Sequence, residues 1–318
     1  MNKIGVENKK YVAVDGGGSK TEFVLFDGRG TLLSREILGG SNPNIVGIDK
    51  SFGILKSGIE KLLKNGEISA VYCGVSGFLS GNNGKKIEKL LSDEFKNVKI
   101  DCSGDMLNVL SSAVDCEKGT AVICGTGSVV FAIDGDVVHR VGGWGYLFDK
   151  AGSGYDMGRD AVSATLAEED GSGEKTLIGE LVREKLGSDA WSGLGYLYSQ
   201  SRAYIASFSK IVINAYNRGD GVAEKIITEN MRELANRINC ASEKYDCGDI
   251  LVISGGMMNE KAVLLPVIKK YLKKPFEIIV PDLPQIFGAC VTCCRKNNVK
   301  IHDFKSKFTE QYKEYSDA

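Results

Sequence analysis

One arrangement of strands and glycine turns occurs twice in this chain, and it limits the folds that the chain can adopt. Each copy reads as a strand, a turn of small residues, a second strand, another turn and a third strand. The strands of the first copy are residues 11–14, 22–26 and about 31–37, and those of the second are 120–124, 128–133 and 137–141. The copies share this order rather than sequence identity, which indicates two similar units in one chain.

Helices alternate with further strands after each copy. Apolar residues recur with the period of a helix in residues 48–63, and further helices are expected at about 154–169 and 222–244, whereas 69–73 and 249–253 read as strands. Strands that alternate with helices predict the α/β class.

The length of 318 residues is enough for two domains of ordinary size. No long linker separates the two copies, and the boundary is expected near residues 115–118. We therefore expect an N-terminal domain of residues 1–116 and a C-terminal domain of residues 117–318. The last helix, 284–295, could pack back on the N-terminal domain, and the charged tail from Phe304 is expected to fray.

Composition excludes several classes of function. The net charge is −1, with 43% hydrophobic and 25% charged residues, so no overall positive field favours nucleic acid or a membrane as a partner. The N-terminus has no apolar stretch for a signal peptide, and no window reaches the length of a membrane span, so we expect a cytoplasmic protein. Two histidines argue against a histidine-rich zinc site and leave little for a Ser/His/Asp triad.

The first glycine turn follows a buried strand and differs from the common nucleotide-binding loops. It consists of Asp15, Gly16, Gly17, Gly18, Ser19, Lys20 and Thr21. A Walker A loop has glycine immediately before Lys-Ser/Thr, and a dinucleotide-binding loop opens a helix rather than a strand. A glycine turn inside a hairpin can instead hold a metal-bound triphosphate, with Asp15 contacting Mg²⁺ through water. An ordinary glycine hairpin explains the same residues.

The second copy carries a matching turn at the same hairpin position, made of Gly125, Thr126, Gly127 and Ser128. Its backbone N–H and hydroxyl groups could contact a phosphate from the opposite side of a cleft, although a tight turn without a ligand has the same residues. Between the two turns, Asp105 lies where a strand ends and a helix begins. A carboxylate there can accept the proton of an attacking hydroxyl, or it can be a plain N-cap.

The order and spacing of these motifs resemble the actin, heat-shock ATPase and sugar kinase superfamily, and within it the N-acetylglucosamine kinase and BadF/BadG-type ATPase branch. The resemblance covers residues 11–292, and the two turns match the family's phosphate loops. The run Ser254–Asn259 is similar to the family's adenosine motif, and Pro284–Ala289 resembles the start of its closing helix.

This resemblance implies two ribonuclease H-like (actin-like ATPase) domains with an interdomain cleft, and it implies that Asp105 is the catalytic base. It also implies four further nucleotide contacts, at Gly255, Gly256, Met257 and Asn259.

The resemblance further implies a sugar side, made of Asn42, Asn44, Ser76, Gly77, Gly143, Trp144, Asp149 and Lys150. Asn42, with Asn44 as the fallback, matches an asparagine that bonds sugar hydroxyls, and Ser76-Gly77 matches the contact to the N-acetyl region. Turn chemistry explains the residues of these loops without a ligand, and core packing explains Trp144.

One position departs from the family pattern. A Gly-Asp-Glu-Gly run is usual there, whereas this chain has Asp149-Lys150-Ala151-Gly152. Either Asp149 compensates by a local shift, or the substrate differs. Lys150 could pair with an anionic group such as the lactyl carboxylate of N-acetylmuramic acid.

The sequence thus predicts transfer of the γ-phosphoryl group of ATP, with Mg²⁺, to the primary hydroxyl of an amino sugar. N-acetylglucosamine is the first candidate, followed by N-acetylmuramate and glucosamine, and a homodimer is expected from the family.

Two other functions remain open. An ATP-driven electron-transfer activator of an acyl-CoA dehydratase or reductase would bind an iron–sulfur cluster through cysteines at a dimer interface. The chain has nine cysteines but no recognisable cluster pattern, and the Cys290-x-x-Cys293 spacing reads as core packing. A sugar-binding sensor without catalysis is less compatible with the presence of both Asp15 and Asp105.

Overall fold

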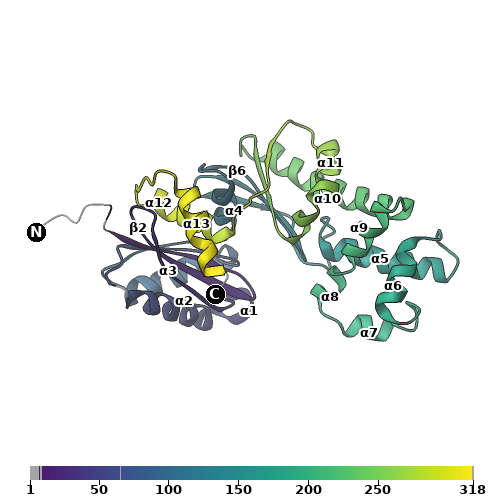
Figure 1. The fold of residues 1–318 in the computed structure, drawn as a ribbon, viewed down its shortest axis with the longest axis horizontal. Coiled ribbons are helices and arrows are strands. Elements are labelled where there is room, and N and C mark those ends of the chain that lie inside the picture. The colour runs from purple at the N-terminus through teal and green to yellow at the C-terminus, as the bar shows by residue number, and fades with distance from the viewer. Residues whose placement is uncertain (1–6, 8, 65, 317–318) are drawn as a thin grey trace, which may run out of the picture. The chain divides into compact units, whose positions relative to one another are not determined.

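Two mixed sheets of five strands each organise the residues that the computed structural model describes, which are 7, 9–64 and 66–316. Each sheet belongs to one of two units. Unit 1 combines Met1–Cys116 with Pro281–Ala318, and unit 2 is Glu117–Val280. The purple start and the yellow end of the chain in Figure 1 thus belong to the same unit. The whole segment from Pro281 lies with the first unit, rather than the last helix alone.

Unit 1 has strands β1 (Lys10–Gly16), β2 (Lys20–Asp27), β3 (Leu32–Gly39), β4 (Ala70–Val75) and β5 (Lys99–Ser103). Its helices are α1 (Pro43–Val46), α2 (Ile48–Leu63), α3 (Asn83–Glu94), α4 (Met106–Ala113), α12 (Gln285–Lys296) and α13 (Phe304–Ser316), with a short 3₁₀ turn at Ser80–Asn82.

The sheet of unit 1 has the order β3-β2-β1-β4-β5. The first three strands form an antiparallel meander, while β1, β4 and β5 are parallel neighbours. Because parallel strands end at the same edge of a sheet, the residues that follow β1, β4 and β5 gather at one edge.

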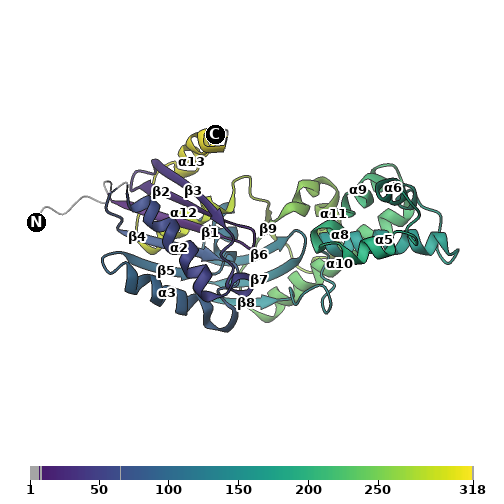
Figure 2. The same cartoon turned by 90° about the horizontal axis from the view of Figure 1, so that it is seen from below.

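Alternating side chains of β1 and β2 supply two separate cores. Val12, Val14, Phe23 and Leu25 pack with α2 and α3, which lie against the sheet in Figure 2. The next residues along the strands, such as Tyr11 and Ala13, pack with α12 and α13 on the other face.

The expectation that the tail frays from Phe304 is wrong, because this segment forms α13 and packs on the sheet. Phe304 and Phe308 are buried in the core with α12. The Tyr312 hydroxyl donates to Glu22 Oε1 at 2.6 Å, and Arg35 Nε donates to the same oxygen at 2.7 Å. Glu22 is only 2% exposed, so these donors compensate a carboxylate that would otherwise be costly to bury.

Unit 2 repeats the topology of unit 1. Its strands are β6 (Lys118–Cys124), β7 (Ser128–Asp134), β8 (Val137–Val141), β9 (Ile250–Ser254) and β10 (Glu277–Ile279), in the order β10-β9-β6-β7-β8. Its helices are α5 (Gly154–Glu169), α6 (Leu177–Leu186), α7 (Leu194–Ser199), α8 (Arg202–Ala206), α9 (Ser209–Asn217), α10 (Gly221–Lys244) and α11 (Lys261–Tyr271), with a 3₁₀ turn at Gly256–Glu260. The meander and its two parallel partners correspond strand by strand to unit 1.

One predicted helix is divided in two. Residues 203–217 form α8 and α9, because Ser207 N bonds the carbonyls of Ala203 and Tyr204, which tightens the chain into a break before Ser209. In the described part of the chain, none of the helices combines the length and the apolar character that a membrane crossing requires.

The contact between α13 and the sheet gives a first prediction. Tyr312→Phe removes one donor to the buried Glu22 carboxylate and should lower the free energy of unfolding by about 1–2 kcal/mol. Thermal unfolding would measure this change. Tyr198→Phe, at a residue that is 88% exposed, is the control and should leave the midpoint unchanged. Equal midpoints for the two variants would show that the Tyr312 hydroxyl does not stabilise α13.

Candidate functional site

Three polar segments meet at the carboxyl edge of the sheet in unit 1. Asp15 and Gly16 end β1, Ser76 follows β4, and Asp105 follows β5. Asp15 and Gly74 are direct partners in the parallel register, and Ser76 N donates to Gly16 O at 2.8 Å. The sheet therefore brings together the predicted phosphate turn, the predicted base and part of the predicted sugar side.

The first glycine turn is a tight hairpin with an exposed tip. Gly17 N donates to Lys20 O at 2.9 Å, and Gly18, Ser19 and Lys20 are exposed. Thr21 lies beneath the tip, fully buried, and its hydroxyl donates to Gly39 O at 2.9 Å. The backbone of the tip can thus contact an anion, whereas the Thr21 hydroxyl is engaged within the unit.

Asp15 is a carboxylate in an unfavourable environment. Its pKa is raised to about 7, chiefly by burial, with smaller contributions from the nearby Asp105 and Glu22 carboxylates. A hydrogen bond from Asn108 Nδ2 to Asp15 Oδ1, at 2.7 Å, and the charge of Lys20 act in the opposite direction. In the described part of the chain, no group of three or more carboxylate, thiol or imidazole side chains is placed to hold a metal ion directly. A cation held through water would still relieve the repulsion on Asp15, so the site fits Mg²⁺, which keeps several of its waters.

Asp105 precedes α4 but does not cap it. Its φ and ψ are −60° and −18°, in the helical region, and its side chain makes no capping hydrogen bond. An N-cap normally has extended dihedrals and bonds the second or third N–H of the helix. The plain N-cap interpretation therefore has no support here, and the carboxylate lies close enough to Asp15 to affect its pKa.

The sugar-side residues of unit 1 form one cluster of hydrogen bonds. Asn42 Nδ2 donates to Ser76 Oγ at 3.3 Å, and Asn42 Oδ1 accepts from Asn44 N at 2.9 Å. Gly77 has a φ of +85°, and a Cβ there would overlap Asn42 Oδ1. Only glycine fits this position, which joins the loop after β4 to Asn42.

Two further residues join this cluster and were missed from the sequence. Asn44 Nδ2 donates to Ser80 Oγ at 3.0 Å, and Asn83 Nδ2 donates to Asn44 Oδ1 at 3.1 Å. Ser80 and Asn83 belong to a segment that reads as an ordinary helix start, so their polar character alone gave no signal.

The second glycine turn is held by its own unit. Gly125 N donates to Gly127 O at 2.8 Å, and Gly154 N, at the start of α5, donates to Gly125 O at 2.8 Å. Gly255 follows the parallel strand β9 with a φ of +109°, and a Cβ there would overlap the Cys124 carbonyl. The loop after β9 thus approaches the second turn as the loop after β4 approaches the first.

The nucleotide residues predicted in unit 2 divide into exposed and buried groups. Thr126, Gly127, Gly256 and Asn259 are exposed. Gly125 and Gly255 are half-buried. Ser128, whose hydroxyl donates to Ala151 O at 2.7 Å, and Met257, whose side chain belongs to the hydrophobic core, are buried.

The loop that departs from the family pattern is fixed by ion pairs. Arg237 Nη2 donates to Asp149 Oδ1 at 2.8 Å, and Asp149 Oδ2 accepts from the N–H groups of Gly143 and Trp144. Burial opposes ionisation of Asp149, but these hydrogen bonds outweigh it and lower its pKa. Lys150 Nζ lies 3.2 Å from Asp160 Oδ2.

Trp144 is 61% exposed, so the core-packing interpretation of this residue is wrong. Arg140 lies 4.9 Å from the centre of its ring. Gly143 and Tyr146 line a small cavity of about 130 Å³, together with Thr126 and Gly127. The predicted turn and the predicted sugar-side loop of unit 2 therefore share one cavity.

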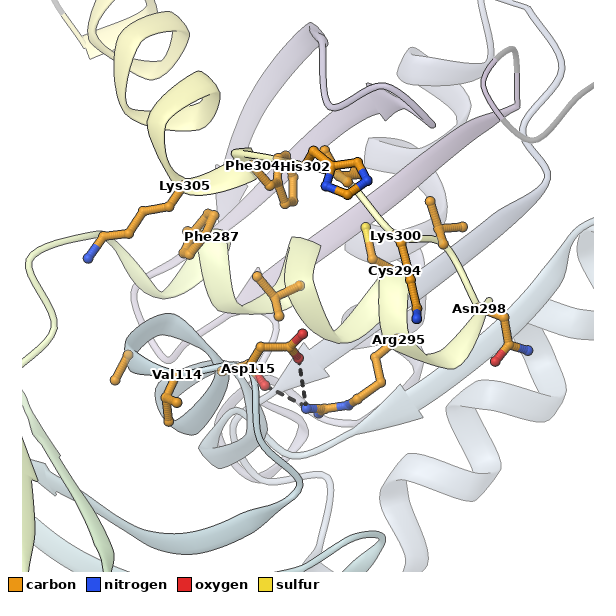
Figure 3. Close-up of a pocket in the computed structure, with 15 residues that line it drawn as sticks. Val114, Asp115, Phe287, Cys294, Arg295, Asn298, Lys300, His302, Phe304 and Lys305 are labelled. Carbon is orange, nitrogen blue, oxygen red and sulfur yellow. Dashed lines mark hydrogen bonds and ion pairs between the residues drawn. The ribbon is translucent and has the colours of Figure 1, made fainter.

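A larger cavity of unit 1 lies away from these residues. It has a volume of about 730 Å³ and is lined by Val114, Phe287 and residues that follow α12. Figure 3 shows the Arg295 guanidinium directed at Asp115, with the two groups 3.6 Å apart. This cavity lies at the C-terminal end of α4, whereas Asp105 lies at its N-terminal end, so none of the predicted site residues lines it.

Comparisons with known proteins agree with the resemblance seen in the sequence. The profile of the BadF/BadG/BcrA/BcrD ATPase family matches residues 12–290. An N-acetylmuramic acid/N-acetylglucosamine kinase of Clostridium acetobutylicum is 29% identical over 298 residues, which are 89% of this chain and 97% of the relative. An N-acetyl-D-glucosamine kinase of Dictyostelium discoideum is 27% identical over 290 residues, 84% of this chain and 91% of the relative.

Solved structures show the same fold. A Porphyromonas gingivalis protein assigned as an N-acetylglucosamine kinase superposes with a TM-score of 0.67 at 22% identity. The superposition covers 92% of this chain and all of the other. At this identity the likeness concerns the fold alone.

The pKa of Asp15 gives a second prediction. Asp15→Asn keeps an acceptor for Asn108 but removes the charge. Because the pKa of Asp15 is about 7 in the folded chain, against an ordinary value of 3.8, the wild type loses stability as the pH rises between these values. The variant should therefore melt about 2–6 °C higher than the wild type at pH 8, and the difference should vanish near pH 4.

Thermal unfolding in metal-free buffer across this pH range would measure the difference. Asp93→Asn, which removes an exposed carboxylate of the same unit, is the control and should show no such pH dependence. A variant that is less stable than the wild type at pH 8 would contradict the environment described for Asp15.

Proposed function

Because the chain belongs to the BadF/BadG/BcrA/BcrD ATPase family, we propose that it is an ATP-dependent kinase for the primary hydroxyl of an amino sugar. N-acetylglucosamine is the first substrate, since relatives along nearly the full length are named for it, and N-acetylmuramic acid is the second. The observation that carries the proposal is the convergence of Asp15, Asp105 and the amide cluster around Asn42 at one sheet edge.

The two units would act as ribonuclease H-like domains of the actin-like ATPase kind, with ATP and the sugar held in a cleft formed by both. The identical strand order of the two sheets supports this, because each unit then offers a glycine turn after an equivalent strand. The first turn supplies the exposed backbone of Gly18 and Ser19, and the second supplies that of Thr126 and Gly127. Gly255, Gly256, Met257 and Asn259 would contact the adenosine.

Asp15 would hold Mg²⁺ through water, with Asp105 and Glu22 adding to the negative field there. The metal ion, when bound, would neutralise charge on the transferred phosphoryl group. The Asp15 side chain itself orients that water and is in turn held by Asn108.

Asp105 would accept the proton of the sugar hydroxyl and orient it for attack. Its carboxylate is not used to cap α4, and it lies at the same edge as the phosphate turn and the amide cluster. Exclusion of water from the reacting groups would prevent hydrolysis of ATP in place of transfer. Asn42, Asn44, Ser76 and Gly77 would position the sugar from unit 1.

In unit 2, the loop with Gly143, Trp144, Asp149 and Lys150 would contact the sugar. Asp149 fixes the backbone of this loop through the N–H groups of Gly143 and Trp144. Lys150 would reach the lactyl carboxylate of N-acetylmuramic acid in exchange for its present partner, Asp160.

The activator function has less support from the cysteines. Of the nine, only Cys240 is exposed, and Cys290, Cys293 and Cys294 are buried in the core of unit 1. A cluster shared between subunits needs several exposed thiolates.

A phosphotransfer assay with purified protein, ATP and a panel of sugars tests the proposal. The panel contains N-acetylglucosamine, N-acetylmuramic acid, glucosamine and glucose, each with and without Mg²⁺. We expect Mg²⁺-dependent turnover with N-acetylglucosamine. ATP consumption without a phosphosugar, or a brown protein with an iron–sulfur spectrum, would exclude the kinase. Gel filtration of the same sample would test the expected homodimer.

The role of Asp105 gives a third prediction. Asp105→Asn should lower kcat by about 10²–10⁴-fold while ATP still binds, because the amide cannot accept the hydroxyl proton. Asp93→Asn is the matched surface control. Near-normal turnover by the Asp105 variant would show that another group is the base.

The ion pair of Lys150 gives a fourth prediction. Lys150→Ala should lower the ratio of kcat/KM for N-acetylmuramic acid to that for N-acetylglucosamine by about tenfold, through the loss of a charge-assisted hydrogen bond. Asp160→Asn, which frees Lys150 from its partner, should raise the same ratio. Unchanged ratios in both variants would exclude Lys150 as a contact to the lactyl group.

A further inference from the structure

Asn108 is a buried amide that neither the family motifs nor the predicted site includes. It lies on α4, three residues after Asp105, and its side chain is fully buried. Its Nδ2 donates to Asp15 Oδ1 at 2.7 Å and to Gly74 O at 3.1 Å. One amide thus bonds both partners of a register pair, one on β1 and one on β4.

The polar side chains at the start of α4 do not make the capping hydrogen bonds that are usual at the N-terminus of a helix. An aspartate before a helix normally caps it, and a polar side chain at the third helical position often bonds back to the cap residue. Asp105 makes no capping bond, and the Asn108 amide points to the sheet. The Asn108 side chain therefore acts toward the edge that carries Asp15, and the Asp105 carboxylate lies close enough to raise the pKa of Asp15.

One glycine makes room for this amide, and a second lets α12 approach the backbone of α4. A Cβ on Gly74 would overlap Asn108 Oδ1, and a Cβ on Gly288, in α12, would overlap the carbonyl oxygen of Asn108. Neither glycine has a positive φ, so space rather than backbone conformation accounts for them. The packing of β4, through Gly74, is thus adapted to an asparagine at this place in α4, whereas Gly288 would be required beside the backbone of any residue there.

The amide also carries a local cost. Among the described residues, Asn108 Oδ1 has no hydrogen-bond partner, although it is buried. A buried acceptor without a partner costs about 1–3 kcal/mol, which a leucine of similar size would avoid. A role in packing alone does not explain such a residue, whereas a bond to a functional carboxylate does.

We propose that Asn108 is a positioning residue that orients the Asp15 carboxylate for the metal ion and links it to the helix that carries Asp105. This rests on the proposed function of Asp15. The hydrogen bond from Asn108 Nδ2 to Asp15 Oδ1 restricts rotation of the Asp15 carboxylate. The second bond, from Asn108 Nδ2 to Gly74 O, fixes the Asn108 side chain. The charged groups that face Asp15 are Asp105, just before α4, and Glu22 and Lys20 on β2. Asn108 is the neutral donor among them.

Nucleotide binding without sugar tests this role apart from catalysis. Calorimetry would measure the Kd of ATP with Mg²⁺ and with EDTA, and the ratio of the two is the metal-dependent gain in affinity. Asn108→Leu should reduce this gain by about tenfold or more, as loss of a residue that orients a metal ligand usually does. The Kd in EDTA should stay within about twofold, because Asn108 lies behind Asp15 and not in the glycine turn.

Two more variants separate positioning from folding. Gly74→Ala leaves Asn108 in place but displaces its amide, so it should reduce the same gain. Asn239→Leu removes a buried asparagine of unit 2 that bonds only the backbone of Tyr271 and Lys273, and it should leave the gain unchanged. Circular dichroism would establish that each variant is folded. If Asn108→Leu is not folded, Asn108→Ser, which is polar but too short to reach Asp15, takes its place.

A full metal-dependent gain in folded variants at positions 108 and 74 would overturn the inference, even if the wild type phosphorylates N-acetylglucosamine. Equal losses in the Asn239 control would also overturn it, since the effect would then be general destabilisation. A loss confined to the variants at 108 and 74 would support it, even if the sugar assay found no amino-sugar kinase activity.

Discussion

Parallel strands that end at a common edge are the constraint on which the rest of this structure depends. In unit 1 the three parallel strands β1, β4 and β5 stop together, and in unit 2 the strands β6, β9 and β10 repeat the arrangement. The loop after the end of each strand takes no part in the hydrogen bonds of the sheet, so its side chains and N–H groups can face outward from the edge. Carboxylates, amides and glycine turns that are far apart along the chain become neighbours for this reason.

The same edge concentrates charge that the fold does not favour. The pKa of Asp15 is raised to about 7, chiefly by burial and further by the charges of Asp105 and Glu22. A chain selected for stability alone would have neutral groups there, because like charges in a poorly solvated place oppose folding. The hydrogen bond from Asn108 reduces this cost, and a cation would offset it further.

Much of the architecture could be predicted from local pattern. Helices 48–63 and 154–169 were predicted with the bounds that the structure has, the first from the helical period of its apolar residues. The fold of α13 was not predicted, because charged residues dominate its sequence. Its aromatic residues Phe304, Phe308 and Tyr312 lie on one face of the helix, which packs on the sheet of unit 1. The exposure of Trp144 was also misjudged, because the sequence around an aromatic residue between glycines does not indicate whether its side chain faces the core or the solvent.

The sequence by itself determined the two repeated units, the glycine turns and the carboxylates at positions 15 and 105, because strand alternation, helical periodicity and glycine spacing are local properties of the chain. Only the tertiary structure decided which polar side chains meet. Asn108, Ser80 and Asn83 gave no signal, since their partners lie on other elements, and Asp105 could be separated from an N-cap only by its dihedrals and missing capping bond. Contacts between distant elements depend on how strands and helices pack, and local sequence does not encode that packing residue by residue.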